Sequence, residues 1–187
     1  MKGGLDMTAS CTALDVANFL VYMMSDSCED LTNMKLNKIL YYAQGHYLRK
    51  FGTPLFRDKI EAWTHGPVVP TVYATYKAFG DQPITKFDSS KLNNLDETKK
   101  SFLLDVARVY GRYTASVLRS MTHQPKSPWN QTGEGKEIPI ETIKSYFEKH
   151  ENEIGPLDIH FSNEDFIGQK NADGVLVLPQ DWADEEI

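Results

Sequence analysis

The chain has 187 residues, of which 41% are hydrophobic and 25% are charged. This length and composition are typical of about one globular domain that buries a core without disulfides or a structural metal. No apolar run approaches the roughly 20 residues that a membrane-spanning helix needs. The first six residues lack the apolar stretch of a secretory signal. We therefore expect a cytoplasmic protein that does not contact a membrane.

The net charge of −6 is distributed unevenly along the chain. Residues 151–187 contain ten acidic residues and one lysine, whereas residues 1–150 contain 19 basic and 16 acidic residues. The sequence thus divides into a domain over 1–150 and an acidic C-terminal extension over 151–187. A body this close to neutral lacks the concentrated basic face that a phosphate backbone requires, so nucleic acid is not an expected partner. The extension is either a solvated tail or a docking segment for a basic partner.

The two cysteines, Cys11 and Cys28, are too few for a disulfide framework. A disulfide between them stays open by count alone. Because cytosolic thiols are normally kept reduced, we expect two free thiols near the ends of one helix.

Helical periodicity predicts two long helices in the first third of the chain. The first is expected from about Thr12 to Asp26 and is apolar on most sides, so it should be largely buried. The second should begin after Thr32, whose hydroxyl can cap it, and end at Gly52 before Pro54. Its apolar stripe is Leu36, Ile39, Leu40, Ala43, Tyr47, Leu48 and Phe51.

Residues 59–63 lack a helical stripe and predict one short strand. Gly66 and Pro67 predict a turn, and Pro67 or Pro70 can occupy the first turn of a third helix that ends at Gly80. The polar residues 83–94 predict an irregular segment.

The second half of the domain predicts three more helices. A fourth is expected over about 95–111, and Thr114 caps a short fifth helix. Residues 123–136 predict a turn-rich loop with Trp129 buried beneath it, and a sixth helix follows from Ile138 to about His150.

One segment of the extension predicts a strand. Residues 174–178 contain β-branched residues and lie between a glycine and a proline. The expected fold class is therefore mainly α: a compact bundle of about six helices with one or two short strands, α+β at most.

Standard catalytic and metal-binding patterns do not occur in the sequence. The five histidines form no close pair with metal spacing, and neither cysteine lies beside one. Glycine-rich phosphate loops and the G-x-S-x-G turn of a serine nucleophile do not occur either. Glu61 and His65 are four residues apart, but their segment is expected to be extended, so they do not share a helical face. We expect no enzyme, no cofactor and no metal site.

Aromatic residues offer a different chemistry. They serve either as core packing or as interface anchors, since Trp and Tyr dominate binding hot spots. Tyr42 is expected to be partly exposed on the flank of its helix, and His65 and His123 are each either a capping residue or a polar group in a binding groove. The residues that we expect to contact a partner are Tyr42, Gln44, Trp63, His65, Tyr73, His123 and Trp129.

Two segments carry a resemblance to a known family. Residues 36–45 read Leu-Asn-Lys-Ile-Leu-Tyr-Tyr-Ala-Gln-Gly, and residues 60–70 read Ile-Glu-Ala-Trp-Thr-His-Gly-Pro-Val-Val-Pro. With Pro54-Leu-Phe and Val72-Tyr73, and more weakly with Pro128-Trp129, they resemble the Panacea antitoxin domain, also described as SocA-like and phage-associated. The resemblance covers about residues 12–150.

The resemblance implies an antitoxin of a type II toxin–antitoxin system, often carried on a prophage, that neutralises a toxin encoded by a neighbouring gene through direct protein–protein binding. Two alternatives are a proteolysis adaptor that delivers the toxin to a ClpXP-type protease, and a prophage interaction protein without a toxin. An undetected enzyme acting near Tyr42, Trp63 and His65 is the alternative from another class. The oligomeric state stays open.

Overall fold

The computed structural model describes residues 11–24 and 31–150, together with the backbone of residues 169–170 and 176–177. Along these residues the elements are α1 (Ala13–Met24), α2 (Asn33–Phe51), β1 (Glu61–Trp63), β2 (Gly66–Val68), α3 (Pro70–Tyr76), η1 (Lys77–Phe79), η2 (Ser89–Asn94), α4 (Glu97–Tyr110), α5 (Ala115–Thr122), α6 (Pro128–Gln131), α7 (Ile140–Lys149), β3 (Gln169–Lys170) and β4 (Leu176–Val177). The helices η1 and η2 are 3₁₀ helices. The fold is mainly α with a little β structure, which confirms the predicted class.

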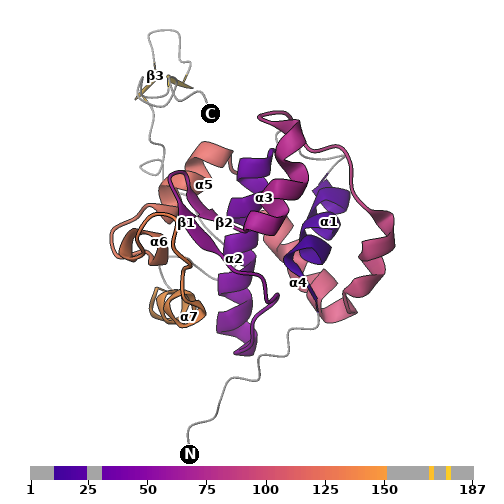
Figure 1. The fold of residues 1–187 in the computed structure, drawn as a ribbon, viewed down its shortest axis with the longest axis horizontal. Helices are drawn as coiled ribbons and strands as arrows, with labels where there is room; N and C mark the ends of the chain where they lie inside the picture. Colours follow the sequence, from indigo (N-terminus) through magenta and orange to yellow (C-terminus); the bar gives the residue numbers. More distant parts are fainter. Residues whose placement is uncertain (1–10, 25–30, 151–168, 171–175, 178–187) are drawn as a thin grey trace, which may run out of the picture.

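Helix α2 is the central element of the fold. It runs through the middle of the molecule, with α1, α3 and α4 on one side and the β1–β2 hairpin, α6 and α7 on the other (Figure 1). Residues 35–48 are buried without interruption, whereas an amphipathic surface helix buries one face only. The Thr32 hydroxyl accepts from the Lys35 N–H at 3.3 Å, and Gly52 ends the helix with φ 74°. Both predicted caps are confirmed.

Gly45 allows α7 to pack closely against α2. A Cβ atom added at Gly45 would lie 2.3–2.5 Å from ring atoms of Phe147, which is fully buried. The Phe147 ring also packs edge-on against Tyr41 and His46, with centroid separations of 5.7 and 5.2 Å. The ring therefore cannot withdraw without opening other core contacts.

Gly45→Ala is expected to lower the free energy of unfolding by about 1–3 kcal/mol, because the added methyl group overpacks this contact and outweighs alanine's better helix propensity. Urea denaturation measures the loss. Phe147→Leu makes room for the methyl group, so the double variant should lose less than the two single variants together. If Gly45→Ala has the free energy of unfolding of the wild type, the Phe147 ring shifts to accept the methyl group without destabilising the fold.

The hairpin differs from its prediction. Strand β1 lies within the predicted strand, but Gly66 and Pro67 belong to β2 and not to a turn. Trp63 pairs with Gly66 in the antiparallel register, so the turn consists of Thr64 and His65. Gly66 has φ 103°, a conformation that glycine adopts without a steric cost. Proline is tolerated in β2 because β2 is an edge strand and Ala62, which lies opposite Pro67, bonds Gly135 and Lys136 instead, so the absent N–H leaves no acceptor unpaired.

Two short helices occupy segments that were expected to be irregular. Helix η2 lies in the predicted irregular segment, and α6 lies in the predicted loop. The Asp88 carboxylate caps η2 by accepting from the Ser90 N–H at 3.0 Å, and the Ser127 hydroxyl caps α6 by accepting from the Asn130 N–H at 3.1 Å. Elements this short do not complete an apolar period, so periodicity does not detect them.

The thiol of Cys11 is free and buried, its Sγ donates to the Leu55 carbonyl at 3.0 Å, and burial raises its pKa to about 11. Cys28 lies outside the described residues. Within the strand predicted over 174–178, the described residues Leu176–Val177 form β4, which pairs antiparallel with β3. The remainder of the acidic extension lies outside the described residues. None of the described helices is long and apolar enough to cross a membrane.

Candidate partner-binding site

The two segments that carry the family resemblance pack against each other. Asn37 Oδ1 on α2 accepts from the Val69 N–H at 2.9 Å, and Lys38 Nζ donates to the Pro67 carbonyl at 3.1 Å. Gly66 permits this close approach, because a Cβ there would lie 2.7 Å from Lys38 Cε and 2.8 Å from Thr122 Oγ1. Polar side chains of the central helix thus fix the backbone of the hairpin's second strand.

Aromatic side chains from three segments meet beside this hairpin. The rings of Trp63 and Tyr73 pack edge-on with their centroids 4.9 Å apart. Trp129 Nε1 donates to the Trp63 carbonyl at 2.8 Å, and the rings of Trp129 and His123 are 3.7 Å apart between centroids. His123 Nε2 lies 3.5 Å from the Thr64 carbonyl. The structure therefore brings together residues that are up to 66 positions apart in the chain.

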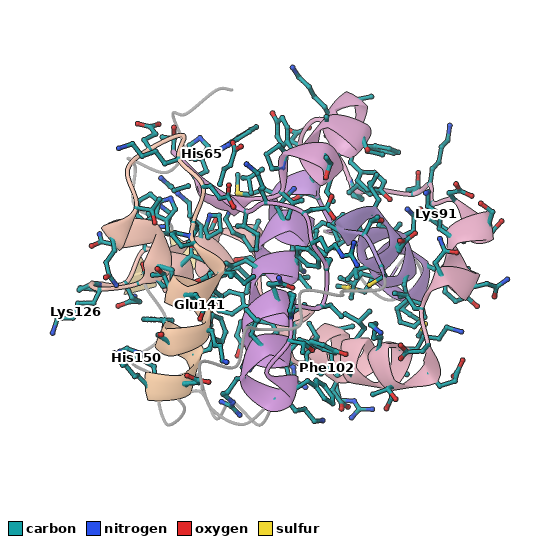
Figure 2. All side chains as sticks on the ribbon, turned by 60° about the horizontal axis from the view of Figure 1, so that its bottom comes forward. His65, Lys91, Phe102, Lys126, Glu141 and His150 are labelled. Atoms are coloured by element: carbon teal, nitrogen blue, oxygen red, sulfur yellow. The ribbon has the colours of Figure 1, made fainter. Side chains whose placement is uncertain are left out.

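We call this surface the hairpin face; it consists of Trp63, His65, Tyr73, His123 and Trp129. All five side chains are half-buried, so Trp129 is less enclosed than predicted. His65 lies in the turn of the hairpin, and Figure 2 shows it on the same side of α2 as Lys126 and opposite Lys91. Half-buried aromatic side chains expose apolar area while their polar atoms stay tethered, which is typical of interface anchors.

Tyr42 and Gln44 do not belong to the hairpin face. Tyr42 is 4% exposed and stacks on Tyr110 at 4.5 Å between centroids, so the prediction of partial exposure is wrong. Gln44 is fully buried. Its Oε1 accepts from the N–H groups of Leu55 and Phe56 at 3.0 and 3.2 Å, and its Nε2 donates to the Phe56 carbonyl at 3.1 Å. A partner docked on the surface of this conformation does not reach either side chain.

Two basic residues beside the hairpin face, Lys38 and Arg119, were not predicted from the sequence as site residues. Lys38 is 1% exposed, and burial lowers its pKa to about 7, with the positive charge of Arg119 adding to the effect. Arg119 on α5 is half-buried, and its Nε is enclosed without a hydrogen-bond partner. Burial likewise lowers the pKa of His123. The sequence signal for Lys38 was its position directly before Ile39 and Leu40 of the apolar stripe. Arg119 gave no signal, since its position depends on how α5 packs.

The hairpin face offers aromatic surfaces, and the half-buried Arg119 lies beside it. Glu61, which was weighed as an acid–base partner of His65, instead accepts from Trp63 Nε1 at 2.9 Å. Over residues 11–24 and 31–150, no three His, Cys, Asp or Glu side chains are grouped so that they could hold a metal ion. These groups are suited to recognition of a protein surface.

Residues 36–130 match the family model described as antitoxin SocA-like, Panacea domain. The match runs from α2 through the hairpin and includes most of α6. The chain is also similar to antitoxin SocA of Caulobacter vibrioides (strain NA1000 / CB15N), at 32% identity over 136 residues, which cover 67% of this chain and 72% of that protein. No solved structure gives a significant match.

Proposed function

Because this chain belongs to the SocA-like antitoxin family with the Panacea domain, we propose that it is the antitoxin of a type II toxin–antitoxin system. Its partner is a toxin encoded by a neighbouring gene, and the hairpin face binds that toxin directly, without a catalytic step. The family match supports the antitoxin role. The observation that supports direct binding is the convergence of half-buried aromatic side chains on one surface.

The hairpin face is suited to a stable complex because its anchors are held before the partner arrives. The Trp129 indole is fixed by its hydrogen bond to the Trp63 carbonyl, and the Trp63 indole is fixed by its hydrogen bond to Glu61. Side chains that are already ordered lose little conformational entropy on binding. A standard interface of about 1,600 Å² in total would centre on these rings and extend over the surrounding surface.

Trp63→Ala is expected to weaken the complex with the neighbouring gene's product roughly 30-fold or more, which corresponds to the loss of a hot spot worth about 2 kcal/mol. Growth on co-expression and the dissociation constant of the purified complex measure the effect. The matched control is Tyr22→Ala. Tyr22 is 47% exposed and lies on α1, on the other side of α2 from the hairpin (Figure 1), so its loss should leave binding unchanged.

Three results would contradict parts of this proposal. If the product of the neighbouring gene is not toxic and forms no complex with this chain, the proposal of a toxin–antitoxin system is wrong. Protection that depends on protease-driven loss of the partner indicates an adaptor that delivers the toxin to a ClpXP-type protease. Loss of protection in a folded His65→Ala variant that still binds the toxin indicates catalysis. The thermal unfolding midpoint of each variant on its own shows whether it remains folded.

A further inference from the structure

The guanidinium of Arg119 is half-buried and lacks a counter-charge. Within the described part of the chain it makes no hydrogen bond or ion pair, and its Nε is enclosed without an acceptor. A guanidinium presents five N–H donors in a planar arrangement that suits a carboxylate. A buried donor without an acceptor raises the free energy of the folded state. The Arg119 Nε therefore lacks a hydrogen-bond acceptor that a bound group could supply.

Two further basic side chains share the environment of Arg119. Lys38 Nζ has the Pro67 carbonyl as its acceptor at 3.1 Å, and His123 Nδ1 lies 2.7 Å from the backbone carbonyl of Arg119. Burial is the main cause that lowers the pKa of Lys38 and His123, and the charge of Arg119 lowers both further. Hydrogen bonds to the backbone carbonyls of Arg119 and Thr64 raise the pKa of His123 and offset only part of this lowering.

The carboxylates at the hairpin do not neutralise this cluster. Glu61 and Glu134 accept hydrogen bonds from other hairpin side chains, at 2.9 and 2.5 Å. Among the ion pairs between described residues, none includes Lys38 or Arg119. The described part of the chain therefore gathers basic groups at one position and supplies no anion there.

We propose that Arg119, with Lys38 and His123 beside it, is a carboxylate-binding site, and that an acidic side chain of the bound protein partner fills it. His123 belongs to the hairpin face, and it contacts the Trp129 ring with its own ring and the backbone carbonyl of Arg119 with its Nδ1, so the site borders the hairpin face. The incoming carboxylate supplies the missing acceptor and offsets the repulsion among the basic groups. This inference rests on the proposed function, since it names the chemistry of the partner at that surface.

Arg119→Met tests the site, because methionine keeps the aliphatic length and removes the charge. We expect it to weaken binding of the neighbouring gene's product roughly tenfold and to reduce the dependence of affinity on salt. Its thermal unfolding midpoint should equal or exceed that of the wild type, whereas a purely structural role would lower it. The control is Arg108→Met, which removes the same charge from an exposed position on α4 where Arg108 pairs with Asp105.

The outcomes separate the two proposals. Wild-type binding by Arg119→Met together with weak binding by Trp63→Ala overturns the carboxylate site and leaves the proposed function standing. Wild-type binding by both variants overturns the hairpin face as the toxin-binding surface, and the carboxylate site falls with it.

A titration of the isolated protein with sodium acetate tests the site without the partner. At constant ionic strength maintained with sodium chloride, the indole N–H resonance of Trp129 should shift saturably in the wild type and not in Arg119→Met. No saturable shift in the wild type overturns the inference. A saturable response to inorganic phosphate but not to acetate overturns the assignment to a carboxylate.

Discussion

Gln44→Leu is expected to lower the free energy of unfolding by about 3–5 kcal/mol. Leucine has a similar volume, so little packing is lost and the change isolates the hydrogen bonds. Gln44 is fully buried and bonds three backbone groups of Leu55 and Phe56. Without the Gln44 amide these three backbone groups stay buried and unpaired. Each unpaired group lowers the free energy of unfolding by about 1–3 kcal/mol, before the surrounding structure relaxes. Urea denaturation at pH 7 measures the loss.

Gln82→Leu is the matched control, because Gln82 is exposed and the same substitution there should change stability by less than about 0.5 kcal/mol. Binding of the partner gives a second readout. Since Gln44 lies beneath the surface, any loss of binding in Gln44→Leu should match the unfolded fraction and vanish at a temperature where the variant is folded. Weak binding by fully folded Gln44→Leu would restore Gln44 as a contact residue.

The central helix shows what local sequence predicts well. The hydroxyl of Thr32 and the left-handed Gly52 act within a few residues of the helix ends, so their chemistry is visible in the sequence. The exposure of Tyr42 was predicted wrongly because periodicity identifies the most apolar face of a helix. It does not reveal how many neighbours surround that helix, which is a property of the whole fold.

The hairpin shows a different limit. The pair Gly66-Pro67 has the composition of a turn, yet β2 begins at Gly66 and the turn is Thr64-His65. Pairing with β1, and the contact of Lys38 with the Pro67 carbonyl, select this register. Neither interaction is local in the sequence.

The candidate site was predicted in part, because the sequence shows which side chains have the chemistry of binding residues but not where the fold places them. Six aromatic or imidazole residues were selected as groups suited to binding, together with Gln44, and the structure brings four of the six into direct contact beside the hairpin. Trp63 and Trp129 meet although 66 positions separate them. Arg119 was not selected, since an arginine on a short helix is ordinary until packing encloses its guanidinium.

Lys38→Met is expected to act on stability in the opposite direction from Gln44→Leu. Burial lowers the pKa of Lys38 from 10.5 to about 7 in the folded protein. Between these values the unfolded chain binds a proton that the folded chain has released, so the wild-type free energy of unfolding rises with pH across this window. Below pH 7 both states are protonated, and the full cost of burying the charge remains, at about 1.4 kcal/mol for each unit of pKa difference.

Methionine removes this cost but leaves the Pro67 carbonyl without its donor, at about 1–3 kcal/mol. The expected net gain is therefore about 2–4 kcal/mol at pH 6. It should fall as the pH rises and become a loss of about 1–3 kcal/mol near pH 10.5, where only the missing donor to the Pro67 carbonyl counts. Urea denaturation at pH 6, 8 and 10 measures this difference. Lys126→Met, at an exposed position, should show no such dependence on pH.

The same substitution should weaken binding of the partner, because it removes a charge beside Arg119. A variant that is more stable and binds less tightly separates a role in recognition from a role in folding, since damage to the fold lowers both quantities. If Lys38→Met instead lowers the free energy of unfolding at every pH from 6 to 10, the hydrogen bond to the Pro67 carbonyl stabilises the hairpin by more than burial of the charge costs. Lys38 would then be a structural support of the hairpin face.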